Sequence, residues 1–380
     1  MLTICGCSQE ENLENTEIEI SPNSANDYIF FEAGTTSTRG TLLKNSLNAP
    51  FSVLGYRYQG TWSAEAPQAK QNKKITYTNN DGQVVSESSN NADNYMGVFH
   101  PNNASVPTVQ TINWETNVHK YTPIQAWQKN LTYTFFAWYP HNLVATDGEG
   151  NPQITYTLPT GGTREARAAM ADVMTDCKID YTKRDGMRVP FQMKHRLAVL
   201  DVKALNLVNA KALRETYTDV PEWKNIKDNE TVTVDVTGLT LTLNPIKASA
   251  TIPLNSNDTN EKMIASGSLN PTYTGFDGYT GLPYSINAAD AKPIIGNDEK
   301  LILIPQNEAI IVTLKLSYRI TCNGIVKTFT NVQPSSEIKI STLEEGKYHY
   351  LLVSITKSGL FIKAQAQNSW IEENVEHEFE

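Results

Sequence analysis

The stretch LILIPQNEAIIVTLKLSYRIT, residues 301–321, holds two apolar runs separated by a short Pro-Gln-Asn turn. In the second run, apolar residues occupy every other position, and mainly polar residues lie between them. The apolar positions of this run are Ile310, Val312, Leu314, Leu316 and Tyr318. A period of two is typical of a β-strand with one buried and one solvent-facing side. Because such a strand is stable only when a second layer covers its apolar side, this stretch predicts a β-sandwich or barrel.

Similar patterns elsewhere predict that the whole protein is all-β. Residues 231–243 alternate with the same period, interrupted only at Gly238, which we expect to mark a bulge or a turn. The Asn-Gly pair at 323–324 predicts a hairpin that joins the first stretch to residues 325–332. Further strands are expected at residues 51–56, 75–78, 84–86, 131–139, 187–205, 348–357 and 360–366, and long loops at 255–297.

The length and charge of the chain limit its organisation and partners. A single hydrophobic core rarely exceeds about 250–300 residues, so 380 residues predict two domains. The strands cluster on both sides of residue 185, which favours two β-sandwiches in tandem, at 41–185 and 186–380. The net charge of −9 argues against nucleic acid as a partner, because phosphate binding needs clustered Lys and Arg. The sequence has no run of 18 apolar residues that would span a membrane as a helix.

No group of residues has the spacing of a catalytic or metal site. The six histidines are scattered, and no metal-binding, nucleotide-binding or nucleophile motif occurs, so we expect no enzyme activity, cofactor or metal. His195 lies on an apolar strand and is expected to be packed or at an edge. Cys177 and Cys322 are expected to be buried thiols, with a disulfide between them as the alternative. Asp147–Asn151 is expected to form a turn, because Leu158 stands where a calcium loop has its glutamate.

The N-terminal segment has features of a surface lipoprotein. Ile4-Cys5-Gly6-Cys7 places small and aliphatic residues before a cysteine, and polar acidic residues follow, which predicts lipidation of Cys7. Only six residues precede Cys7, fewer than a secretion signal needs, so either the start codon is misplaced or residues 1–7 are a truncated signal. The alternatives are that Cys5 and Cys7 are incidental or bind a metal, for which no further ligands lie nearby.

Residues 8–40 are expected to form a tether, a first strand and a cleavable loop. The tether contains a short alternating piece, Ile18 and Ile20, and the next strand candidate is Tyr28–Phe31. A loop of small residues follows and contains one basic residue, Arg39. Exposed loops of this kind are where proteases cut. Arg39 is therefore either a solvated arginine or a processing site of a trypsin-like protease.

Local patterns in a consistent order extend along nearly the whole chain. They are the Cys7 segment, Arg39-Gly40, FSVLGY at 51–56, YTFFAWYP at 133–140, ADVM at 171–174, FQMKHRLA at 191–198, IPQN at 304–307, and GKYHY at 346–350 before Trp370. No single pattern is specific, but the ordered set resembles the fimbrillin family. Members of that family are subunits of the surface pili of Gram-negative gut and oral anaerobes.

The resemblance implies two tandem transthyretin-like β-sandwich domains and a role in assembly. It implies a lipoprotein anchored through Cys7 in the outer membrane, exposed at the cell surface and built into a fimbria that supports adhesion. It also implies that a trypsin-like surface protease cuts between Arg39 and Gly40, and that a strand from another pilin subunit then replaces the first strand. The displaced strand implied here comprises Ile18, Ile20, Tyr28, Ile29, Phe30 and Phe31.

The donated strand has more than one candidate. In the tail after Trp370, apolar residues share one parity, but Glu373 and His377 interrupt them; the apolar residues are Ile371, Val375 and Phe379. The alternatives are strands 348–366 after a rearrangement, or a tip subunit that accepts a strand and gives none. A different class of protein, a glycan-binding surface lipoprotein not assembled into pili, would use exposed aromatic residues such as Trp62 and the 255–297 loops to bind host protein or glycan.

Overall fold

The structure is a computed structural model that describes most of the chain. The described residues are 29, 31–36, 42–46, 51–58, 61–62, 75–78, 84–87, 95–99, 127, 131–143, 145–146, 152–183, 188–254, 262–295 and 300–367. Several predictions therefore fall outside the described residues: those on Cys7, Ile18, Ile20, Tyr28, Phe30, Arg39, Gly40, the 147–151 turn, Ile371, Val375 and Phe379. The described chain consists mainly of β-strands in several sheets, with few and short helices, which confirms the all-β prediction. None of its helices is long and apolar enough to span a membrane.

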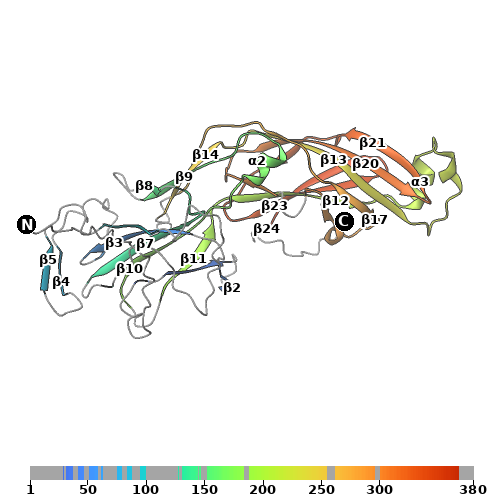
Figure 1. The fold of residues 1–380 in the computed structure, drawn as a ribbon. Coiled ribbons are helices and arrows are strands. Elements are labelled where there is room, and N and C mark those ends of the chain that lie inside the picture. The colour runs from blue at the N-terminus through green and yellow to red at the C-terminus, as the bar shows by residue number, and fades with distance from the viewer. Residues whose placement is uncertain are drawn as a thin grey trace, which may run out of the picture.

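The first sheet contains the N-terminal strands and lies at one end of the molecule (Figure 1). Its described strands, in spatial order, are β2 (Leu42–Ser46), β1 (Phe31–Thr36), β11 (Val189–His195), β10 (Met174–Tyr181), β7 (Thr132–Tyr139), β3 (Ser52–Tyr58) and β6 (Tyr95–Phe99). Strand β7 is buried on both faces: Phe135 points into one hydrophobic core and Phe136 into another. The strands predicted at 75–78 and 84–86 form a separate antiparallel pair, β4 (Ile75–Thr78) and β5 (Val84–Glu87).

Two further sheets lie at the other end and share one core (Figure 1). One contains β12 (Ala198–Asn206), β18 (Lys292–Pro293), β19 (Leu301–Leu303), β23 (Tyr348–Thr356) and β24 (Gly359–Gln367). The other contains β13 (Val232–Asn244), β16 (Thr272–Tyr273), β17 (Tyr279–Pro283), β20 (Ile310–Cys322), β21 (Ile325–Val332) and β22 (Ile338–Ile340). The inward-facing side chains of both sheets belong to the same hydrophobic cluster, as in a β-sandwich.

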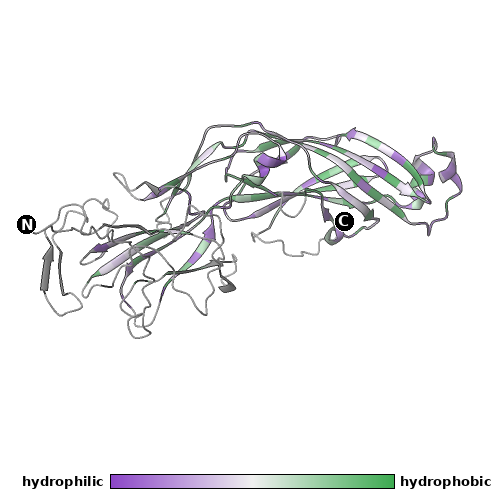
Figure 2. Cartoon of the chain, in the orientation of Figure 1, coloured by the Kyte–Doolittle hydropathy of each residue, from purple (hydrophilic) through white to green (hydrophobic). Residues whose placement is uncertain are grey.

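The strongest sequence patterns predicted their strands correctly. Side chains of β20 alternate between buried and exposed along most of its length, and polar and apolar bands alternate on the long strands in Figure 2. The pairing of β13 with β20 shifts register between Val236 and Gly238, which confirms the predicted irregularity. Asn323 and Gly324 have φ values of 50° and 77°, as the tight turn of the β20–β21 hairpin requires.

Three expectations differ from the structure. Residues 187–205 form two strands rather than one, because β11 and β12 belong to different sheets. The region expected to be long loops contains short strands. Among them, β15 (Ile264–Ser266) pairs with β14 (Ser249–Pro253), and β16 and β17 pair with β13. Strand β1 begins at Phe31 and extends to Thr36, so Gly34–Thr36 are strand residues and not the start of a loop.

A fourth sheet joins segments from before and after residue 185. Strand β9 (Gln153–Thr157) pairs with β14 (Ser249–Pro253), and β8 (Ala145–Thr146) and β15 lie at the edges. The short helix α2 (Arg164–Ala168) follows, and the buried Arg167 in it donates to the carbonyl oxygens of Thr274 and Gly275. Residues 153–168 are thus bonded to the later part of the chain, while the domain boundary near 185 stays a prediction.

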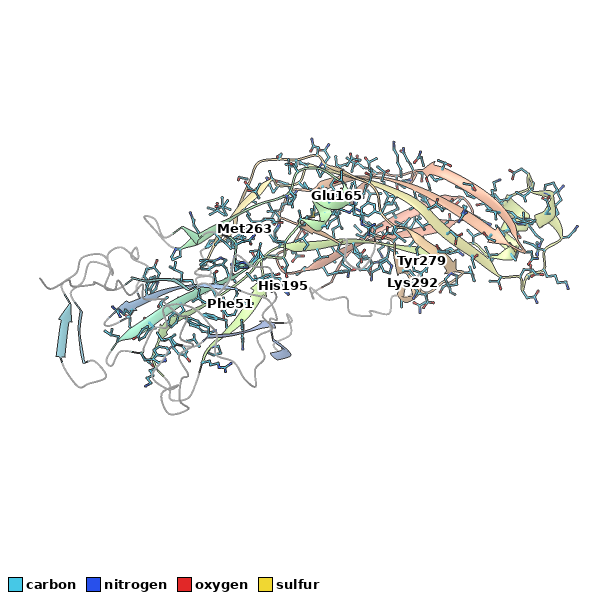
Figure 3. All side chains as sticks on the ribbon, viewed as in Figure 1. Phe51, Glu165, His195, Met263, Tyr279 and Lys292 are labelled. Atoms are coloured by element: carbon cyan, nitrogen blue, oxygen red, sulfur yellow. The ribbon has the colours of Figure 1, made fainter. Side chains whose placement is uncertain are left out.

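The remaining helical turns lie in the later part of the chain. Helix α3 (Ala210–Thr216) begins at Asn209, whose side chain accepts from the backbone N–H of Ala212, and the 3₁₀ turns are η2 (Pro221–Asn225) and η3 (Ala288–Asp290). Figure 3 shows Phe51 among the strands of the first sheet and His195 near the point where the chain leaves it.

Candidate functional site

Strand β1 is the candidate functional element, because the resemblance to fimbrillins implies that the first strand is exchanged. Of the predicted strand residues that the structure describes, Phe31 lies in β1 and Ile29 precedes it. Three side chains here are almost completely buried: Ile29 is 0% exposed, Phe31 2% and Ala33 3%. They lie at alternate positions, as expected of residues on one face of a strand. We call Ile29, Phe31 and Ala33 the β1 face. The strand lies inside the sheet, between β2 and β11, and not in loose coil beside it.

Aromatic side chains hold the β1 face in the core. The ring of Phe31 meets Phe135 of β7 edge to face, with the centroids 5.2 Å apart, and stacks on Phe191 of β11 at 5.9 Å. Phe51 contacts Phe191 from the other side, at 6.2 Å. Aromatic pairs of this kind contribute about 0.5–1.5 kcal/mol each beyond the apolar area that they bury. These rings belong to one buried hydrophobic cluster, which also contains Tyr133 and Met193.

The backbone of β1 pairs on both sides. It runs parallel to β11, with Phe31 opposite Val189 and Ala33 opposite Phe191. On its other side it pairs antiparallel with β2, with a register shift between Gly34 and Thr36. Removing β1 would therefore leave two rows of backbone N–H and C=O groups without strand partners, and each buried group left so costs about 1–3 kcal/mol.

The position of Arg39 relative to β1 matters for the candidate site. Strand β1 ends at Thr36 and β2 begins at Leu42, so Arg39 and Gly40 stand between them in the sequence. Because β1 comes before β2, a cut after Arg39 would separate β1 from all later strands. The strand would then be held only by its packing and its hydrogen bonds.

The partner strand β11 is held to β10 partly by a carboxylate. Only two residue pairs join the strands, Met174 with His195 and Thr175 with Lys194. Further along, Asp176 of β10 accepts from the backbone N–H of Gln192 at 2.7 Å. Lys178 donates to the same oxygen at 2.8 Å. Asp176 thus supports the strand against which β1 packs.

A polar cluster lies where the chain passes from β11 to β12. His195 Nδ1 is 2.8 Å from Asp172 Oδ2, so His195 is packed and paired with a carboxylate, in agreement with its predicted structural role. The buried Arg196 donates to Thr175 Oγ1 at 2.9 Å and to the carbonyl oxygen of Pro253 at 3.1 Å, and it forms an ion pair with Glu345. One guanidinium thus connects β10, the end of β14 and the loop before β23.

A buried carboxylate on β12 was not predicted as a site. Asp201 is fully buried and accepts from the Tyr348 hydroxyl, and burial raises the pKa of the carboxyl group. The ammonium groups of Lys203 and Lys300 lie over tyrosine rings, 4.7 Å from the Tyr350 centroid and 4.9 Å from the Tyr348 centroid. The sequence feature that could have indicated this site is a charged residue, Asp201, within an otherwise apolar strand. Because Asp201 has no exposed surface, it is not placed to meet a substrate.

The other predicted residues are in ordinary structural surroundings. Cys177 and Cys322 are buried and are not joined by a disulfide, which confirms the thiol prediction over the disulfide. Trp62 packs on Tyr56 at 5.2 Å and on Phe136 at 5.7 Å between ring centroids. No group of three His, Cys, Asp or Glu residues in the described part of the chain is arranged to hold a metal ion.

Comparisons with known proteins show what this chain is similar to. A family model described as fimbrillin-like matches residues 69–372. A crystal structure of a fimbrial protein from Bacteroides vulgatus is 17% identical, with a TM-score of 0.56 over 91% of this chain and 100% of that chain, and it shows a shared fold. The sequence matches no curated protein.

Two further solved structures cover most of the chain at lower similarity. One is a candidate cell adhesion protein from Bacteroides uniformis, 13% identical, with a TM-score of 0.40 over 90% of this chain and 99% of that chain. The other is a fimbrilin from Porphyromonas gingivalis, 8% identical, with a TM-score of 0.36 over 87% of this chain and 90% of that chain. Because the family model spans most of the 380 residues, the chain belongs to the fimbrillin-like family.

Proposed function

We propose that this protein is a pilin, a structural subunit of a cell-surface fimbria that supports adhesion. In this proposal a trypsin-like protease cuts after Arg39, β1 leaves, and a strand from another subunit takes its place. The observation that carries the proposal is the position of β1. Its side chains are buried in an aromatic core, yet the strand precedes every other described strand and is joined to them only through residues 37–41.

The energetics support a replacement rather than an empty groove. Burying Ile29 and Phe31 contributes about 1.5–3 kcal/mol each, and the β1 backbone adds hydrogen bonds to β2 and β11. A domain stable by only about 5–15 kcal/mol does not easily lose that much. A strand supplied by a neighbour restores both the packing and the backbone pairing. The same interactions that hold β1 would therefore join two subunits.

The proposal includes the remaining parts of the expected setting. Cys7 carries the lipid that anchors the precursor in the outer membrane, and the mature subunit is exposed at the surface. Its partners are other pilin subunits, with host protein or glycan as the target of adhesion. In this proposal the protein acts by assembly, and the buried Asp201, which accepts from the Tyr348 hydroxyl, is part of its own interior. The glycan-binding alternative gains no support from Trp62, which is packed against two other rings.

Limited proteolysis of the purified full chain tests the proposal. We expect trypsin to cut first after Arg39. The cut protein should then form oligomers, seen as a ladder on a gel of unheated samples. The matched control is the Arg39→Gln variant, which should stay uncut at this position and monomeric. A chain that is cut after Arg39 but stays a monomer when supplied with cell-surface subunits would contradict the proposal.

A further inference from the structure

Strand β11 borders the space that β1 occupies, and an aspartate of β10 helps to hold it there. We propose that Asp176 is a positioning residue for strand exchange: its carboxylate keeps β11 against β10 where the backbone pairing of these two strands stops. The inference rests on the proposed function, because it concerns β11 while β1 is absent. Asp176 has the same effect whichever strand enters, since it acts on the strand that stays.

Strand β11 is paired more extensively with β1 than with β10. Residues 189–193 of β11 pair with residues 31–35 of β1. On its other side, residues 194–195 pair with residues 174–175 of β10. Five residue pairs thus join β11 to the strand that leaves, and two join it to the strand that stays. Without β1, β11 therefore depends on its bonds to β10 for its position in the sheet.

The Asp176 carboxylate replaces backbone pairing at the point where the β10–β11 ladder ends. A continued antiparallel register would place Asp176 opposite Met193. Instead, Asp176 Oδ2 accepts from the backbone N–H of Gln192 at 2.7 Å. The aspartate is 5% exposed, so water competes little for this bond, and hydrogen bonds to a charged acceptor are roughly twice as strong as neutral ones. One side chain thus does what a backbone carbonyl does in a regular ladder.

A lysine of the same strand bonds to the same carboxylate oxygen. Lys178 Nζ donates to Asp176 Oδ2 at 2.8 Å, and the two residues share one face of β10 because they lie two positions apart. Met174 lies on that face as well, and it belongs to the hydrophobic cluster that contains Phe31. Lys178 therefore helps to fix the carboxylate on the side of the sheet where β1 packs, within reach of Gln192.

The two ends of β11 are held differently. The polar cluster around Arg196 fixes the end that leads into β12. Near the other end, the Tyr181 hydroxyl donates to the carbonyl oxygen of Arg188 at 3.4 Å, which is long for a hydroxyl donor. The Asp176 bond lies between these two regions. When β1 has left, we expect loss of this bond to let residues 189–192 separate from β10, so that an entering strand must first move them back.

Binding of the N-terminal fragment to the cut full-length protein tests the inference. Native mass spectrometry measures the fraction of fragment that stays bound as the protein is diluted. Asp176→Ala removes the acceptor, whereas Asp176→Asn keeps an oxygen that can accept from the Gln192 N–H. We expect Asp176→Ala to weaken fragment binding about 10- to 100-fold, because a hydrogen bond to a charged acceptor is lost and the groove is no longer preformed. Asp176→Asn should bind the fragment more tightly than Asp176→Ala, because it restores the acceptor.

Two further measurements separate this role from a general loss of stability. The control is Val234→Ala, a truncation of a buried residue in β13, which belongs to the sheets at the other end of the molecule (Figure 1). It should destabilise the sandwich but leave fragment binding within about twofold. Hydrogen–deuterium exchange follows the amides of residues 189–193. Asp176→Ala should speed their exchange more in the cut protein than in the uncut one, because the uncut chain keeps β1 in place beside β11.

The other outcomes have distinct meanings. If Asp176→Ala binds the fragment like the unchanged protein, or if Val234→Ala weakens binding as much, Asp176 does not position β11, and the inference is wrong while the proposed function stands. If Asp176→Asn binds as weakly as Asp176→Ala, the bond to Gln192 is not what holds β11, and the inference is again wrong. If the unchanged protein stays monomeric after the cut, the proposed function fails. Exchange at residues 189–193 then decides separately: faster exchange in Asp176→Ala supports the role of Asp176 in holding β11, and unchanged exchange contradicts it.

Discussion

Replacing Phe31 with alanine should weaken the hold of the first sheet on β1 more than any other change in that strand. The ring is 2% exposed, so nearly all of its apolar surface is removed from water. The substitution also removes two aromatic contacts, one with Phe135 and one with Phe191. Substitution of a buried Phe by Ala costs about 3–5 kcal/mol, which includes the cavity that it leaves. After the chain is cut, the same loss should weaken binding of the β1 fragment by about 10²- to 4 × 10³-fold.

Two assays separate the effects of this substitution. Equilibrium unfolding in denaturant measures the loss of stability in the uncut variant. Native mass spectrometry of the cut protein measures how much N-terminal fragment stays bound as the protein is diluted. The matched control is Phe361→Ala, because this phenylalanine of β24 is 58% exposed and its removal should cost under about 1 kcal/mol.

A small effect of Phe31→Ala on stability and on fragment binding would contradict this explanation. If the Phe31→Ala variant unfolds like the control, and its cut form keeps the fragment with unchanged affinity, then contacts with the aromatic core do not hold β1 in the sheet. The groove would then have no aromatic position to recognise a donated strand, and another part of the strand would have to hold it.

Three further predictions concern buried polar groups. Arg196→Ala should destabilise the protein by about 1–3 kcal/mol in denaturant unfolding, because the Thr175 hydroxyl and the Pro253 carbonyl oxygen lose this donor. His349 Nε2 accepts from the Glu344 N–H at 3.1 Å, and burial lowers the pKa of the imidazole. The stability that depends on neutral His349 is therefore present above its unfolded pKa and is lost as pH falls through the folded pKa. Stability should therefore fall between pH 7 and 5, and less so in His349→Gln. The raised pKa of Asp201 has the opposite sign, so its contribution is lost as pH rises, and Asp201→Asn, which keeps an acceptor for Tyr348, should gain relative stability from pH 4 to pH 8 in the same assay.

Local alternation was enough to predict the strands that have one wet and one buried face. Strand β20 alternates because one side faces the sandwich core, and the sequence carries that pattern directly. Strand β12 is buried at every position, so its sequence lacks a period, and the break from β11 could not be located. That break is set by tertiary contacts of Arg196 with distant segments.

The first strand predicted from the sequence and β1 overlap only at Phe31. The prediction was Tyr28–Phe31, whereas β1 runs from Phe31 to Thr36, with the buried Ile29 just before it. That this strand is exchanged stays a prediction. Gly34 and the two threonines after it resemble a loop, and they form a strand because β2 and β11 supply backbone partners on both sides. Strand pairing between distant segments, such as β9 with β14, leaves no local pattern. The Asp201–Tyr348 contact joins residues 147 apart, so only the fold could reveal it.

In the proposed mechanism β1 is a temporary part of the subunit and leaves before assembly. Mass spectrometry of the protein in isolated surface fimbriae tests this directly, because it identifies both the first residue of the assembled subunit and any retained fragment. We predict that the assembled subunits begin at Gly40 and lack the segment that contains Phe31. Assembled subunits that still hold this segment, covalently or as a bound fragment, would contradict the account.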